Sequence, residues 1–122
     1  MVHGEDGLDE ITLAGKTHVA ETQNGEVKTF DIGPEDFGFD VGAIEHLRGG
    51  DADANAEIVS GVLSGERKDE ARALVIMNAA AALFLGEAAG DLREGARLAA
   101  HAIDSGEAMR KLDLLIEATS GP

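Results

Sequence analysis

The sequence predicts an α+β fold in which a strand cut short and a β-hairpin precede about five helices. Asn24-Gly25 divides two β-prone runs within residues 17–32. Further along the chain, acidic residues that can cap helices precede segments with apolar residues at helical spacing. Residues 73–85 are almost wholly apolar. These observations place the strands first and the helices after them.

The hairpin is predicted from its turn. A two-residue turn of this type needs positive φ at both central positions, and Asn-Gly tolerates that conformation best. Pro34 then ends the second strand, because proline cannot donate to a sheet. The first strand is expected at residues 1–4, and residues 11–13 are also β-prone. The register set by the turn pairs Thr17 with Ile32, Val19 with Phe30, and Glu21 with Lys28.

The helices are predicted from their caps and apolar stripes. Asp91 and Glu94 form an aspartate version of the capping box. The residues 34–40 are expected to be a connector. The expected helices are 41–48 after Asp40, one from Asp51 or Asp53 to Gly65, 68–88, one after Asp91, and one after Ser105.

The longest predicted helix is apolar on nearly every face from Ala73 to Leu85. A helix of this kind belongs in the centre of a larger body, and a chain of 122 residues has little to surround it. Together with the shortened first strand, this indicates pieces of a larger α/β body. Asn78 interrupts the apolar run. We expect its amide to bond a backbone group across a helix–helix contact, with a ligand role as the alternative.

Composition excludes several function classes. The net charge is −14, with 24 acidic against 10 basic residues, which argues against binding nucleic acid or an anionic membrane. A cationic partner stays open, beside plain solubility or a high-salt host. There is no cysteine, which excludes disulfides and thiolate metal sites. No apolar run reaches the ~20 residues that span a bilayer, and no signal peptide is visible, so a cytoplasmic protein is expected.

The candidate site is the acidic pair Asp9 and Glu10, which follows Gly4 and Gly7. Mg²⁺ prefers oxygen ligands and takes one or two carboxylates together with waters and substrate phosphates. In a flexible loop both side chains can converge on such an ion; a solvated turn is the alternative. His3 could assist a phosphate or a leaving group, or could be a strand-end histidine bonded to backbone. No histidine spacing suggests zinc.

Several segments in order resemble one known family. VHGEDGLDE, residues 2–10, is similar to the carboxyl-terminal third of the anthranilate phosphoribosyltransferases. The resemblance covers essentially the whole chain, and the run of segments is more specific than any single motif. It continues through PEDFG (34–38), LRGGDADANA (47–56), LVIMNAAAALFLGE (74–87) and GARLAAHAIDSGEAMRKL (95–112).

The resemblance implies a role and a domain. Residues 1–122 would form the carboxyl-terminal part of the family's α/β phosphoribosyltransferase domain. The family's enzymes transfer phosphoribose from phosphoribosyl pyrophosphate to anthranilate in tryptophan biosynthesis. Asp9 and Glu10 would then hold the Mg²⁺ that accompanies the pyrophosphate, and His3 and Gly4 would contact substrate. The resemblance assigns no catalytic residue to this chain.

The departures from the family bear on activity. Its amino-terminal helical domain, its glycine-rich pyrophosphate loop and the arginine that meets anthranilate would all lie before Met1. We therefore expect the chain alone to be inactive, with the missing amino-terminal segment as its partner. The alternative is a small acidic, non-catalytic binding or assembly module that retains part of the fold and self-associates or binds a partner.

Overall fold

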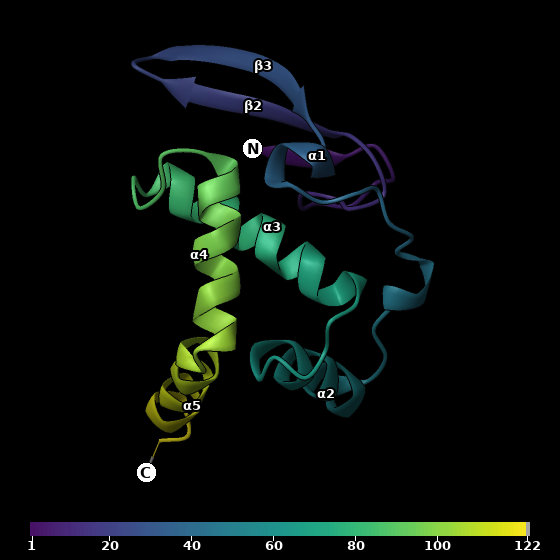
Figure 1. The fold of residues 1–122 in the computed structure, drawn as a ribbon, viewed down its shortest axis with the longest axis vertical. Helices are drawn as coiled ribbons and strands as arrows, with labels where there is room; N and C mark the ends of the chain where they lie inside the picture. The colour runs from purple at the N-terminus through teal and green to yellow at the C-terminus, as the bar shows by residue number, and fades with distance from the viewer. Residues whose placement is uncertain (122) are drawn as a thin grey trace.

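The strands form one antiparallel sheet in the order β1-β2-β3 (Figure 1). The structure is a computed structural model that describes residues 1–121, apart from the side chain of His46. Strand β1 is Val2–Gly4, β2 is Thr17–Gln23 and β3 is Glu26–Ile32. The predicted α+β class, with a short first strand and a hairpin ahead of the helices, is confirmed.

The hairpin has the predicted turn and register. Asn24 and Gly25 have φ values of 52° and 82°, the positive values that the turn requires. The three predicted pairs, Thr17 with Ile32, Val19 with Phe30, and Glu21 with Lys28, are all confirmed. Strand β1 lies along the other edge of β2, with Val2 opposite Val19. The β-prone run 11–13, in contrast, is not a strand.

The helices follow the hairpin. Figure 1 shows α3 near the middle of the molecule, crossing α4, with α2 and α5 at the end remote from the sheet. Their bounds are α1 Pro34–Phe37, the 3₁₀ turn η1 Glu45–Leu47, α2 Ala52–Leu63, α3 Glu70–Leu85, α4 Leu92–Asp104 and α5 Glu107–Thr119.

Two of the predicted caps are confirmed. Asp51 Oδ1 accepts a hydrogen bond from the Ala54 amide at 2.9 Å, and Asp91 Oδ1 accepts one from the Glu94 amide at 2.7 Å. Glu94 reaches back as in a capping box, but it accepts from the amide of Gly90. The predicted Ser105 cap is wrong. Ser105 closes α4, and Gly106, at φ 79°, begins α5.

The segment between the sheet and α2 was predicted incorrectly. The helix expected at 41–48 is only the 3₁₀ turn η1. The Gly42 amide donates to the Leu13 carbonyl at 3.0 Å, so this segment pairs with the loop before β2 instead of coiling on itself. The connector at 34–40, in turn, contains the short helix α1. Pro34 stands at its start, and Asp36 Oδ2 accepts from the Gly33 amide at 2.8 Å.

The core lies where α3 meets α4, α1 and the loop before β2. Helix α3 is buried at Ala71, Ile76, Met77 and Ala80, whereas Val75, Phe84 and Leu85 are 39%, 40% and 72% exposed. The apolar helix is thus only partly covered within the described residues. No helix among those residues has the length and apolar character to cross a membrane. The buried core residues are Ile11, Leu13, Phe37, Val62, Ala71, Ile76, Met77, Ala80, Ala96, Ala99 and Ile103.

Candidate functional site

The acidic pair lies on the loop that joins β1 to β2, residues 5–16. The side chains of Asp9 and Glu10 are both exposed. The chain reverses just before them, because the Gly4 amide donates to the Leu8 carbonyl at 2.8 Å and the Gly7 amide to the Gly4 carbonyl at 2.9 Å. Gly7 has a φ of 91°, a conformation that favours glycine. The loop therefore presents two neighbouring carboxylates at its outer turn.

The two ends of this loop are tied to each other. The Glu5 amide donates to the Lys16 carbonyl at 2.9 Å, and Glu5 Oε1 accepts from the Lys16 amide at 3.0 Å. Glu5 thus extends the pairing of β1 with β2 by one step, using its side chain in place of a backbone carbonyl. The acidic pair is held on a loop whose base is closed.

Two buried threonines support the loop from inside. Thr12 and Thr17 have no exposed surface. The Thr12 hydroxyl donates to Asp6 Oδ2 at 2.7 Å and accepts from the Ala14 amide at 3.0 Å. The Thr12 amide donates to Thr17 Oγ1 at 3.0 Å. Nothing in the local sequence pattern identified these threonines, because their partners are set by the course of the loop.

Asp6, like Glu5, is an acidic residue of the loop whose side chain has hydrogen-bond partners within the loop. Besides Thr12, the Leu8 amide donates to its Oδ1 at 3.1 Å. Burial acts to raise the pKa of this carboxyl, but the hydrogen bonds from Thr12 and Leu8 outweigh it, so the pKa lies below its ordinary value. Asp6 is thereby kept ionised and committed to the loop, whereas Asp9 and Glu10 are left facing solvent.

Asn78 of α3 holds the loop immediately after the acidic pair. Its Oδ1 accepts from the Ile11 amide at 3.0 Å, and its Nδ2 donates to the Ile11 carbonyl at 2.9 Å. The same Nδ2 donates to the Leu74 carbonyl at 3.0 Å. The prediction that this amide bonds a backbone group is confirmed. The expected place was wrong, because the partner is the loop and not another helix.

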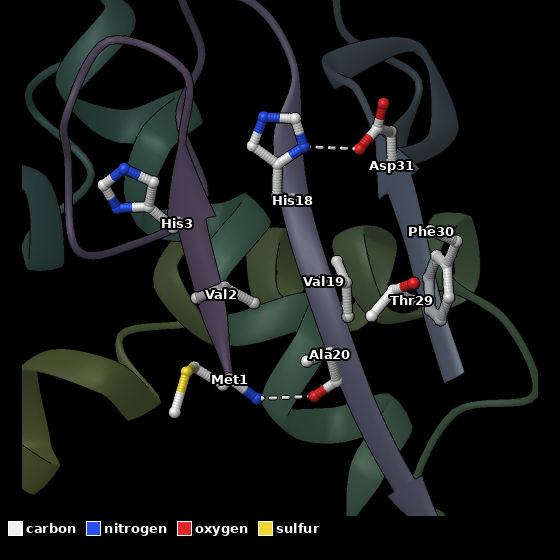
Figure 2. A pocket seen from close by; sticks show the side chains of 9 residues that line it. All are labelled: Met1, Val2, His3, His18, Val19, Ala20, Thr29, Phe30 and Asp31. Atoms are coloured by element: carbon white, nitrogen blue, oxygen red, sulfur yellow. Dashed lines mark hydrogen bonds and ion pairs between the residues drawn. The ribbon is translucent and has the colours of Figure 1, made fainter. Parts of the chain in front are cut away.

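The two predicted substrate contacts, His3 and Gly4, differ in accessibility. Gly4 is buried, its amide is used within the loop, and a Cβ there would lie 2.5 Å from Asp6 Oδ1. Close packing therefore accounts for this glycine. His3 is exposed on β1 and lines an open hollow of about 520 Å³ on the sheet (Figure 2). Its ring is thus reachable by another molecule.

His18 and Asp31 form a pair on the surface of the hairpin. The two residues are opposite each other on β2 and β3, with His18 Nδ1 2.6 Å from Asp31 Oδ1 (Figure 2). The Lys16 ammonium lies 3.8 Å from the other oxygen of Asp31. Figure 2 shows the ring of His3 turned away from this pair. The pair links β2 and β3 through their exposed side chains.

A second hollow, of about 490 Å³, lies between the loop and the segment around η1. Asp6, Gly7 and Leu8 line it from the loop, and Arg48 and Leu74 are among the residues opposite. Arg48 is exposed and was not identified from the sequence as a candidate. Among the residues that the structure describes around this hollow, Arg48 is the basic one. Such a group suits a phosphate or a carboxylate.

The acidic pair offers two oxygen ligands of the kind that Mg²⁺ takes. Across residues 1–121, no group of three or more His, Asp or Glu side chains is arranged to hold a metal ion. Mg²⁺, however, keeps several waters and commonly takes only one or two carboxylates, with substrate phosphates completing its shell. Asp9 and Glu10 are two carboxylates of this kind, adjacent and exposed. The remaining ligands would come from water, a bound phosphate or another polypeptide segment.

Comparison with known proteins then decides the family. Residues 1–109 match the glycosyl transferase family, a/b domain. The chain belongs to this family. The anthranilate phosphoribosyltransferase of Methylocella silvestris is 51% identical over 120 residues, which is 98% of this chain and 34% of that protein. The chain thus spans about a third of the length of the relatives it matches.

Solved structures of the family share the fold. Anthranilate phosphoribosyltransferase from Saccharomyces cerevisiae, in complex with PRPP and Mg, is 31% identical with a TM-score of 0.86, over 98% of this chain and 34% of that one. The enzyme from Thermus thermophilus is 33% identical with a TM-score of 0.84, over 95% of this chain and 34% of that one. The resemblance expected from the sequence motifs is confirmed.

Proposed function

We propose that this chain is the carboxyl-terminal segment of an anthranilate phosphoribosyltransferase, in which Asp9 and Glu10 supply ligands for Mg²⁺. The observation that carries the proposal is the loop 5–16: it closes at its base, is supported from inside, and presents two neighbouring carboxylates to solvent. The Saccharomyces cerevisiae relative, solved in complex with PRPP and Mg, supports this choice of metal and substrate.

The reaction would be transfer of phosphoribose from phosphoribosyl pyrophosphate to anthranilate, as in tryptophan biosynthesis. A bound Mg²⁺ supplies neutralisation of the negative charge on the departing pyrophosphate. Asp9 and Glu10 would bind and orient that ion from one side. In this proposal His3, exposed on β1, and Arg48, beside the loop, would meet phosphate oxygens, and Gly4 would contribute through close packing of the loop.

We propose further that the chain alone is inactive, because the acidic pair lacks the groups that would hold the rest of the substrate. A segment equivalent to the other two-thirds of the relatives would provide them. The cytoplasmic setting expected from the sequence belongs to the same proposal, as does the assignment of residues 1–122 to the carboxyl-terminal part of the α/β domain.

The test is complementation. The 122-residue chain is mixed with the part of the Methylocella silvestris enzyme that it does not match, and the loss of anthranilate is followed with phosphoribosyl pyrophosphate and Mg²⁺ present. We expect no turnover by either piece and Mg²⁺-dependent turnover by the mixture. Full turnover by the chain alone would defeat the claim of inactivity. No gain on mixing would count against complementation.

The alternative, a small non-catalytic assembly module, has one observation in its favour. Helix α5 buries none of its residues, and Leu114, Leu115 and Ile116 are 47%, 59% and 52% exposed. With the exposed end of α3, these residues are suited to covering by another polypeptide. Light scattering and the binding of an apolar dye test this alternative. A monodisperse monomer that binds no apolar dye would argue against the assembly module.

A further inference from the structure

We infer that Asn78 is a positioning residue for the acidic pair: from the middle of α3 it fixes the backbone next to Glu10, and so sets how well the loop binds a divalent cation. The inference rests on the proposed role of Asp9 and Glu10. Asn78 itself does not touch the metal in this account. It acts through Ile11, which follows Glu10 directly in the chain.

The geometry of the contact carries the argument. Asn78 makes two hydrogen bonds to one residue, accepting from the Ile11 amide at 3.0 Å and donating to its carbonyl at 2.9 Å. The amide nitrogen of Ile11 belongs to the same peptide unit as the carbonyl of Glu10. Fixing that unit restricts the backbone at Glu10, and with it the direction in which the Glu10 side chain leaves the chain relative to Asp9.

The anchor itself is rigid. Asn78 lies within α3, and its second amide hydrogen is bonded to the Leu74 carbonyl one turn earlier. The neighbouring residues Ile76, Met77 and Ala80 are buried. Ile11 is only 2% exposed, so the clamped peptide is packed against the same core. The loop therefore takes its position from the helix, across 67 positions of sequence.

Residues that orient the ligands of a metal ion through hydrogen bonds, without binding the ion themselves, affect the affinity for the metal. Removing such a partner typically costs roughly 10–100-fold in metal binding or activity, because the ligands lose their common orientation. Two exposed carboxylates on a free loop would each bind a cation weakly. Held in one arrangement, they bind it as a pair.

The chain provides a matched control for this contact. Asn55 makes the same kind of clamp at the start of α2, where its Oδ1 accepts from the Gly50 amide at 2.9 Å and its Nδ2 donates to the Gly50 carbonyl at 3.2 Å. Replacing Asn55 by alanine removes an equivalent pair of hydrogen bonds. It leaves the loop that carries Asp9 and Glu10 untouched.

The experiment titrates the 122-residue chain with Mn²⁺, a paramagnetic substitute for Mg²⁺, and follows broadening of the amide resonances of residues 8–11. Relative to the wild type, we expect Asn78→Ala to raise the half-saturating Mn²⁺ concentration about tenfold or more, and Asn55→Ala to leave it within about twofold as a surface change. Loss of hydrogen-exchange protection at the Ile11 amide in Asn78→Ala would show that the clamp has been released.

The outcomes separate the two claims. If Asp9→Asn with Glu10→Gln titrates like the wild type, the pair holds no cation, and the proposed function and this inference both fall. If that double variant loses binding but Asn78→Ala does not, the positioning role alone is wrong. Should Asn78→Ala fail to fold by circular dichroism, Asn78→Ser serves instead. Its hydroxyl can bond the Leu74 carbonyl within the helix, and it is expected to show the same rise.

Discussion

Asp6 and Thr12 are joined by a hydrogen bond of 2.7 Å from the threonine hydroxyl to a carboxylate oxygen, inside the loop that presents the acidic pair. Thr12 has no exposed surface, so its hydroxyl depends on this partner. The contact links the two halves of the loop and is stronger when the carboxyl is ionised. The stability of the loop should therefore depend on pH.

The pKa of Asp6 lies below the ordinary 3.8, because the hydrogen bonds from Thr12 and Leu8 outweigh the effect of burial. Asp6 therefore binds a proton more readily in the unfolded chain than in the folded chain. Its contribution to the free energy of unfolding is complete above pH 3.8 and is lost as the pH falls through the lower pKa of the folded state. We expect urea unfolding of wild type to lose more stability between pH 5 and pH 2.5, as rough bounds, than that of Asp6→Asn. Thr12→Val should reduce this difference between wild type and Asp6→Asn. If the free energy of unfolding depends on pH equally in those two proteins, the role of Asp6 is refuted.

The crossing of α3 and α4 depends on Gly95. A Cβ at this position would lie 2.6 Å from the Ala80 carbonyl oxygen and 3.0 Å from the Ala80 Cα, both backbone atoms that cannot turn aside. We expect Gly95→Ala to destabilise the chain by about 1–3 kcal/mol in urea unfolding, despite alanine's helix propensity. Gly61→Ala in α2 is the control, because the added Cβ would meet only the flexible Arg67 side chain at 3.1 Å. Equal stabilities for the two variants would show that the crossing is not tight.

The core beneath Asn78 is tested at Met77, which has no exposed surface. Met77→Ala should lower the free energy of unfolding by about 2–5 kcal/mol, through lost burial and the cavity left behind. Leu85→Ala, at a side chain that is 72% exposed, should change it by no more than about 0.5 kcal/mol. Chemical denaturation of both variants at one pH makes the comparison. A loss at Met77 no larger than at Leu85 would contradict the assigned core.

The parts of the fold that could be predicted are those set by neighbours in sequence. The Asn24-Gly25 turn fixes the hairpin register by itself, and Asp51 and Asp91 accept from amides three positions ahead. The short α1 carried a local signal too, in Pro34 and Asp36, but four residues of helix leave no periodic stripe to recognise. At 41–48 the apolar spacing suggested a helix, whereas a contact from Gly42 to the distant Leu13 prevails.

In the candidate site too, the sequence predicts the features that neighbouring residues determine and misses those that distant contacts determine. Asp9 and Glu10 are predicted as ligands from a motif, because the two carboxylates are adjacent in sequence. Their support could not be found, because it comes from Asn78, 67 positions from Ile11, and from two threonines whose partners depend on how the loop folds back. Asn78 was recognised as an amide that needed a backbone partner, but only the three-dimensional structure shows which one.

The central claim is that Asp9 and Glu10 together hold a divalent ion for the departing pyrophosphate. It is tested most directly in the complemented enzyme with two double variants. One combines Asp9→Asn and Glu10→Gln, and the other, which removes the same amount of charge from α5, combines Asp113→Asn and Glu117→Gln. The account predicts that the first double variant loses at least about 100-fold in Mg²⁺-dependent turnover, while the second stays near the wild type and both keep the wild-type circular dichroism. Wild-type turnover in the first variant would mean that the pair is only a solvated turn.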